Sequence, residues 1–171
     1  MTKHILFTAA LFLGSLPAHA EQGLIVHKAL SLDMAMTMAQ GSLEKCRASG
    51  YKCAVTVLGA TGRTIIAFED DGANLHRFDV ARRKAYTALV YRRPSKEVVE
   101  GWSKKTAEPT PLLEGTMPNP PIEGTIDMGG GLPIMVGNEV IGAIAVSGAP
   151  GWDMDEACAK AGLAKVADKL K

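Results

Sequence analysis

The 171-residue sequence lacks an excess of charge of either sign, because 19 Lys and Arg residues stand against 18 Asp and Glu residues. Nucleic-acid-binding domains usually carry a clear basic excess, so this balance argues against that class. The three cysteines are too few for a disulfide scaffold, and none of their spacings is the C-x-x-C of a redox or zinc motif. A chain of this length, with 47% hydrophobic residues, is expected to fold as one ordinary domain.

The sequence also lacks an apolar run long enough to span a membrane, since a transmembrane helix needs about 20 apolar residues. The apolar stretch at residues 5–13 is shorter and follows the positively charged Lys3. Ala18-His19-Ala20 then supplies an A-x-A cleavage pattern. We therefore predict that residues 1–20 are a signal peptide and that the mature chain, residues 21–171, is periplasmic or secreted.

Histidine is scarce once this peptide is removed, since the mature chain keeps His27 and His76. The mature chain is formally neutral because Lys3 is lost with the peptide. This shortage of imidazole groups argues against acid–base catalysis and against a metal site built from protein ligands. The sequence therefore predicts no set of catalytic residues and no metal site.

Export would place the cysteines in an oxidising compartment, where disulfides form. Six residues separate Cys46 from Cys53, so a local Cys46–Cys53 disulfide is one interpretation, with Cys158 as a buried thiol. Three buried, reduced cysteines acting as small apolar side chains are an equal alternative.

Hydrophobic periodicity predicts the order helix, hairpin, two helices, loop, hairpin, helix. The predicted strands are residues 51–58, 63–69, 132–136 and 139–147. Helices are expected from Leu32 with Ser31 as N-cap, from about residue 77 to before Pro94, from Ser95, and from Asp153 with Glu156 as capping-box partner. Both strand pairs are antiparallel hairpins, which predicts an α+β domain with helices flanking one small antiparallel sheet.

Two glycine- and proline-rich stretches interrupt this pattern. Residues 108–124 hold five prolines and are predicted to form an irregular, functional or surface-crossing loop. Residues 129–131 are three consecutive glycines, but a strand follows them, whereas a nucleotide-binding loop opens a helix. We expect these glycines to allow close backbone packing or to face a ligand.

The second predicted helix carries most of the candidate site residues. Six basic residues are opposed within that segment by Asp79: Arg77, Arg82, Arg83, Lys84, Arg92 and Arg93. Guanidinium groups pair well with carboxylates, although charged helix residues usually form a solvated face. His76 precedes them and could ligate haem iron or a metal, or could simply be exposed.

Four segments resemble the GlcG/HbpS family of haem-binding proteins, in the right order along the chain. They are residues 81–88 (ARRKAYTA), 130–134 (GGLPI), 142–150 (GAIAVSGAP) and 155–159 (DEACA). The resemblance implies a profilin-like α+β fold with a five-stranded antiparallel sheet, and assembly into homo-oligomers. Residues 124–128 could supply the fifth strand.

The resemblance implies haem, or a similar planar anionic ligand, as the bound cofactor. The matched positions of the second helix give Lys84 and Thr87, to which its basic character adds Arg83 and local chemistry adds His76. Arg83 and Lys84 are expected to hold the haem propionates, with Thr87 or His76 near the iron. The implied function is that of a haem carrier or an accessory to a membrane sensor. The alternatives are an enzyme that degrades haem or processes a small organic acid, and a purely interacting subunit of a membrane sensor system.

Overall fold

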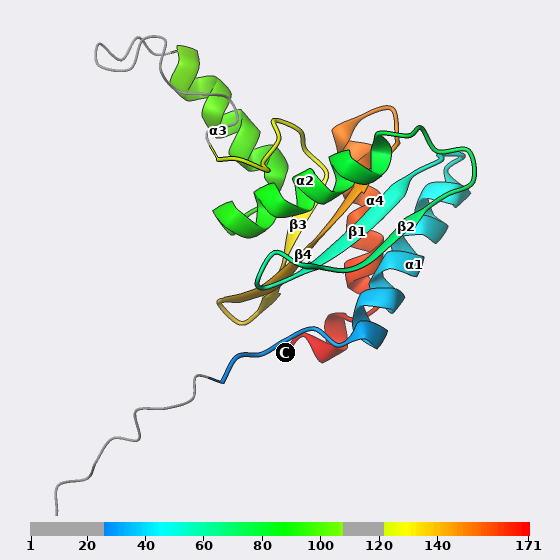
Figure 1. Cartoon of the computed structure of the whole chain (residues 1–171), viewed down its shortest axis with the longest axis vertical. Coiled ribbons are helices and arrows are strands. Elements are labelled where there is room, and N and C mark those ends of the chain that lie inside the picture. The colour runs from blue at the N-terminus through cyan, green and yellow to red at the C-terminus, as the bar shows by residue number, and fades with distance from the viewer. Residues whose placement is uncertain (1–25, 108–121) are drawn as a thin grey trace, which may run out of the picture.

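The computed structural model describes residues 26–107 and 122–171 of the chain (Figure 1). The predicted signal peptide and most of the proline-rich stretch lie outside these residues. The predicted order of elements is confirmed. The elements are α1 (Leu32–Ala48), β1 (Ala54–Gly59), β2 (Thr64–Glu69), α2 (Arg77–Tyr91), α3 (Ser95–Ala107), β3 (Gly131–Val136), β4 (Glu139–Ser147), α4 (Trp152–Ala164) and a short 3-10 helix (Ala167–Lys169).

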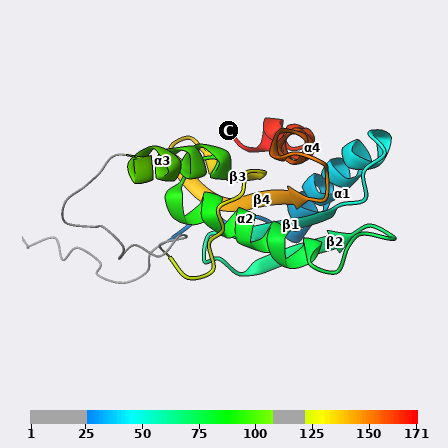
Figure 2. The ribbon, with the colours of Figure 1, turned by 90° about the horizontal axis from the view of Figure 1, so that it is seen from above.

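The strands form one antiparallel sheet in the order β2-β1-β4-β3, so the two predicted hairpins meet through β1 and β4. Figure 2 shows this sheet as a middle layer, with α1 and α4 on one face and α2 on the other. Helix α3 contacts α2 and the edge strand β3. This arrangement confirms the α+β class.

The two faces of the sheet carry side chains of different size, because successive strand residues point to opposite faces. Toward α1 and α4, branched side chains such as Val55, Val57 and Ile144 join a large apolar core. The face toward α2 carries a smaller core of Leu58, Ala143 and Ala145, packed against Ala85 and Ala88 of the helix. Small side chains on both surfaces leave room for α2 to lie close to the strands.

The predicted fifth strand is not found in the described part of the chain, where the sheet has four strands. Residues 124–128 lie against α2 instead of pairing with β3. The Ile126 N–H donates to Thr87 Oγ1 and the Thr125 carbonyl accepts from Arg83. The backbone carbonyl of Thr125 and the N–H of Ile126, which a fifth strand would use to pair with the sheet, are thus hydrogen-bonded to side chains of α2.

The two predicted helix caps have different outcomes. Ser31 caps α1 as expected, since its Oγ accepts from the Met34 N–H at 3.2 Å. The predicted capping box of α4 is wrong, because the helix begins at Trp152 with Gly151 as N-cap and without a side-chain cap. Glu156 pairs instead with Lys160 one turn later.

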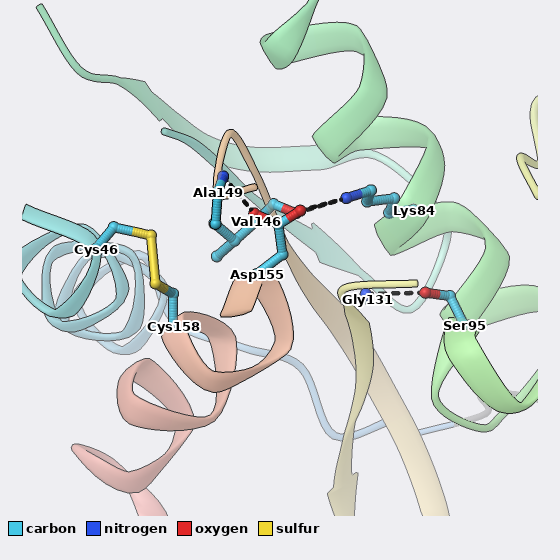
Figure 3. A network of polar contacts seen from close by, with 8 residues as sticks. All are labelled: Cys46, Lys84, Ser95, Gly131, Val146, Ala149, Asp155 and Cys158. Carbon is cyan, nitrogen blue, oxygen red and sulfur yellow. Dashed lines mark hydrogen bonds and ion pairs between the residues drawn. A yellow bond between two sulfur atoms is a disulfide. The ribbon is translucent and has the colours of Figure 1, made fainter. Parts of the chain in front are cut away.

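Both interpretations of the cysteines, the Cys46–Cys53 disulfide and three reduced thiols, are also wrong. The disulfide joins Cys46 of α1 to Cys158 of α4, with 5.6 Å between their Cα atoms (Figure 3). Cys53 is buried and free. The buried face of α1 packs against α4, so Cys46 meets a residue 112 positions away in sequence and not its near neighbour.

An ion pair between Arg47 and Asp70 ties the end of α1 to the end of β2. Arg47 donates through Nε and Nη2 to Asp70 Oδ1 at 3.1 and 2.9 Å. The Asp70 side chain is buried, whereas that of Arg47 is about half exposed. The hydrogen bond from Arg47 holds the pKa of the Asp70 carboxyl below its usual value of 3.8.

This ion pair predicts an acid-sensitive contribution to stability. Because the folded pKa lies below the unfolded one, the contribution is fully present above pH 3.8 and is lost as pH falls through the folded value. Asp70→Asn is expected to lower the free energy of unfolding by about 1 kcal/mol at pH 7, with a smaller difference at pH 3. Urea unfolding at both pH values measures this, with the exposed Asp71→Asn as control. A difference that does not change with pH would contradict it.

Candidate functional site

Lys84 of α2 lies in the interior, where it joins α2 to β4 and α4. Its side chain is 2% exposed, and its Nζ donates to Asp155 Oδ2 at 2.7 Å and to the Val146 carbonyl at 3.3 Å (Figure 3). The other oxygen of Asp155 accepts from the Ala149 N–H at 2.9 Å. Lys84 and Asp155 therefore form a buried ion pair that links three elements.

The glycine run gives this pair its space. A Cβ at Gly130 would lie 2.9 Å from Asp155 Cβ and 3.2 Å from Lys84 Nζ, and the backbone there has a φ of 115° that favours glycine. A Cβ at Gly131 would collide with the Lys84 carbonyl. The Gly131 N–H donates to Ser95 Oγ at 2.9 Å, which joins β3 to the start of α3. The close-packing interpretation of the glycines is thus the one the structure supports.

Burial and charge act against each other in the Lys84–Asp155 pair. Burial lowers the pKa of Lys84 and raises that of Asp155, because a nonpolar environment disfavours both charged forms. The charge of each partner opposes the effect of burial on the other. Each group therefore depends on the other to remain ionised inside the protein.

Arg83 and Thr87 hold the segment that precedes β3 against α2. Arg83 Nη2 donates to the Thr125 carbonyl at 2.8 Å. Thr87 is fully buried, and its hydroxyl donates to the Arg83 carbonyl and accepts from the Ile126 N–H, both at 2.9 Å. The Thr87 hydroxyl is thus already engaged within the protein, whereas Arg83 keeps a partly exposed side chain.

His76, unlike Lys84 and Thr87, is exposed to solvent. It occupies the N-cap position of α2, makes no side-chain capping hydrogen bond and is exposed to solvent. Two neighbouring apolar side chains are exposed with it, Leu75 at 98% and Phe78 at 41%. An imidazole that faces solvent beside apolar side chains can bind the metal of a ligand without any rearrangement of the protein core.

The four predicted site residues do not converge on one point. His76 and Thr87 are separated by 11 residues on α2, or roughly 16 Å along the helix axis. Lys84 points toward Asp155 in the interior, as Figure 3 shows. The structure thus divides the predicted set into two interior residues, Lys84 and Thr87, and two accessible residues, His76 and Arg83.

Sequence reasoning missed the roles of Asp155 and Ser95. Asp155 lies in the family-like segment 155–159, but no sequence signal marked it as the partner of Lys84, which is 71 positions away. Ser95 was expected to begin a helix, as it does, whereas the hydrogen bond that its hydroxyl accepts from the Gly131 N–H was not predicted.

The described residues contain neither a metal-binding group nor a membrane-spanning helix. In the described part of the chain, no three His, Cys, Asp or Glu side chains gather as a metal-binding group. Within residues 26–107 and 122–171, no helix has the length and apolar character of a membrane span.

The fold and the buried pair define a small α+β domain in which an internal Lys–Asp ion pair joins α2 to α4, and the same lysine is hydrogen-bonded to β4. Residues 30–164 match the family described as haem degrading protein HbpS-like. The chain belongs to this HbpS-like family, which confirms the resemblance seen in its sequence.

Known structures and relatives agree with this assignment. The chain is similar to a double mutant of HbpS from Streptomyces reticuli, with 29% identity, a TM-score of 0.74, and coverage of 88% of this chain and 97% of that one. An uncharacterized 15.0 kDa protein of Citrobacter freundii is 29% identical over 119 residues, which cover 70% of this chain and 80% of the relative. A complex of PduOC with haem has the same fold at 20% identity, with a TM-score of 0.67 and coverage of 81% and 95%.

Proposed function

We propose that the mature protein binds haem at the N-terminal end of α2, with the His76 imidazole as iron ligand. The observation that carries the proposal is the exposed His76 beside exposed Leu75 and Phe78. Imidazole is a common axial ligand of haem iron, and a porphyrin ring buries its apolar faces against apolar side chains. Membership of the HbpS-like family and the haem complex of PduOC support this choice of ligand.

Arg83 is the proposed partner of a haem propionate. It follows His76 by seven residues, which places both on one side of α2 and roughly 10 Å apart along its axis. One N–H of its guanidinium is used by the Thr125 carbonyl, and a guanidinium has five donors. Bound haem supplies the iron chemistry, while these residues hold and orient it.

Lys84 and Thr87 are proposed to act on haem only indirectly, by holding α2 in place. An ammonium group already paired with a buried carboxylate at 2.7 Å is not free to bind a propionate. The Thr87 hydroxyl is engaged at both the Arg83 carbonyl and the Ile126 N–H. Of the four predicted site residues, His76 and Arg83 are therefore the two proposed to contact haem directly.

Export of the protein forms part of this proposal. The A-x-A pattern at residues 18–20 supports cleavage after residue 20. The Cys46–Cys158 disulfide supports it independently, because disulfides persist in oxidising compartments. N-terminal sequencing of protein from the periplasm or medium is expected to give a chain that begins at Glu21. Assembly into a homo-oligomer and a membrane sensor partner stay predictions.

Titration of the mature protein with haemin tests the proposal. We expect a saturable shift of the Soret band at micromolar haemin, unchanged in His27→Ala, which removes the other histidine of the mature chain. The absence of any saturable shift would contradict haem binding.

The same complex distinguishes a carrier from a haem-degrading enzyme. A reductant in air, or peroxide, is added to the saturated protein and the Soret band is followed. A carrier or sensor keeps the band, whereas an enzyme bleaches it faster than free haemin bleaches under the same conditions.

A further inference from the structure

A cavity of about 350 Å³ lies at the end of α2 opposite His76. Its walls are the β1–β2 turn at residues 60–62, Val140 of β4, and Tyr86, Leu89, Val90 and Arg92 of α2 and its end. This volume lies within the range of small-molecule sites, which are about 300–1,000 Å³. His76 and Arg92 are 16 residues apart, or roughly 24 Å along the helix, and neither His76 nor Arg83 of the proposed haem site lines the cavity.

The cavity has an aromatic wall that two glycines make possible. A Cβ at Gly62 would lie 3.2 Å from the Tyr86 ring, and a Cβ at Gly124 would lie 3.3 Å from it. Both positions have a positive φ that favours glycine, 78° and 84°. The Tyr86 ring is therefore held between two backbone segments. With Leu89 and Val90 it forms the apolar part of the cavity lining.

Arg92 is the cationic group of this cavity and stands in an unfavourable backbone conformation. It ends α2 with φ 55° and ψ 34°, the left-handed region that glycine usually fills at this position. Among the described residues it is the one non-glycine with positive φ. Its side chain is exposed, and in the part of the chain that the structure describes no carboxylate pairs with it.

Residues in strained backbone conformations cluster at functional sites. A glycine would end the helix at lower cost, yet the position holds a guanidinium at the edge of an open cavity that Tyr86 and Leu89 also line. A guanidinium matches the two oxygens of a carboxylate with paired hydrogen bonds. We propose that this cavity binds a small monocarboxylate with an apolar body, its carboxylate on Arg92 and its body against Tyr86 and Leu89.

Benzoate is the probe that tests this second site. In the full mature protein, benzoate is expected to shift the amide NMR signals of residues 60–62, Leu89 and Val140 in a saturable manner. Benzyl alcohol, which keeps the ring and lacks the charge, is expected to bind at least tenfold more weakly. The absence of saturable shifts, or equal binding of benzyl alcohol, would overturn the proposal.

Arg92→Gly separates a binding role from a structural one. Glycine relieves the strained conformation, so the melting temperature is expected to stay the same or rise, while benzoate binding falls at least tenfold. Arg92→Asn, which also tolerates this backbone region, is expected to do the same. The neighbouring Arg93→Gln carries the same loss of charge and is expected to leave binding unchanged. Retained binding in both Arg92 variants, or an equal loss in Arg93→Gln, would contradict the assignment.

Discussion

Replacing Lys84 by Met is expected to lower the free energy of unfolding by about 3–5 kcal/mol, among the largest effects of any single substitution in this protein. The substitution leaves the Asp155 carboxylate buried with the Ala149 N–H as its remaining partner. An uncompensated charge in the interior is costly, because it has lost both water and its counter-ion. Urea unfolding followed by circular dichroism measures the change.

A double variant shows that the cost comes from the orphaned charge. Lys84→Met with Asp155→Leu replaces the pair by apolar side chains and is expected to recover much of the lost stability. Lys165→Met is the matched control, since Lys165 pairs with Glu44 where both side chains are exposed, and its loss is expected to cost less than about 0.5 kcal/mol. A Lys84→Met protein as stable as this control would contradict the interior role of Lys84.

Loss of the Cys46–Cys158 disulfide is the second large effect expected. The bond closes a loop across 112 positions, so Cys158→Ala is expected to lower the free energy of unfolding by about 2–5 kcal/mol. The effect arises mainly in the unfolded chain, which gains conformational freedom when the long loop is opened. Reduction of the wild-type protein by dithiothreitol is expected to destabilise it by a similar amount.

The pairing itself can be read from peptides released without reduction. A digest is expected to contain the Cys46 and Cys158 peptides joined, whereas joined Cys46 and Cys53 peptides would contradict the structure. Burial raises the pKa of the Cys53 thiol to about 12, so it is expected to react slowly with iodoacetamide at pH 8 in the native state.

Local signals were sufficient to predict the elements of the fold. Ser31 marks the start of α1, and a continuous apolar run at residues 140–146 marks β4, whose predicted bounds 139–147 match the structure. Each of these features depends on contacts between residues close in sequence. The order of elements and the α+β class followed from them.

Contacts between distant segments could not be predicted in the same way. The disulfide partner of Cys46 depends on how α1 packs against α4, and residues 124–128 are drawn from the sheet by side chains of α2. Periodicity within one segment carries no information about either contact. The sequence placed Cys158 and Thr87 on the right elements without revealing their partners.

In the candidate site, too, local features could be predicted and contacts between distant segments could not. The helix that carries the basic residues was found, and His76 was placed correctly at its start. The burial of Lys84 was not predicted, because a charged side chain is expected to face solvent or a bound ligand. Its partner Asp155 lies 71 positions away in the sequence. A buried lysine is rare without a counter-ion, so only the fold could reveal it.

Haemin titration of His76→Ala beside Thr87→Val tests the central claim most directly, under conditions in which circular dichroism shows both variants folded. The account predicts that His76→Ala loses the saturable Soret shift, while Thr87→Val keeps it despite a lower melting temperature. A shift lost in Thr87→Val and retained in His76→Ala would contradict the account and return the iron ligand to the interior face of α2.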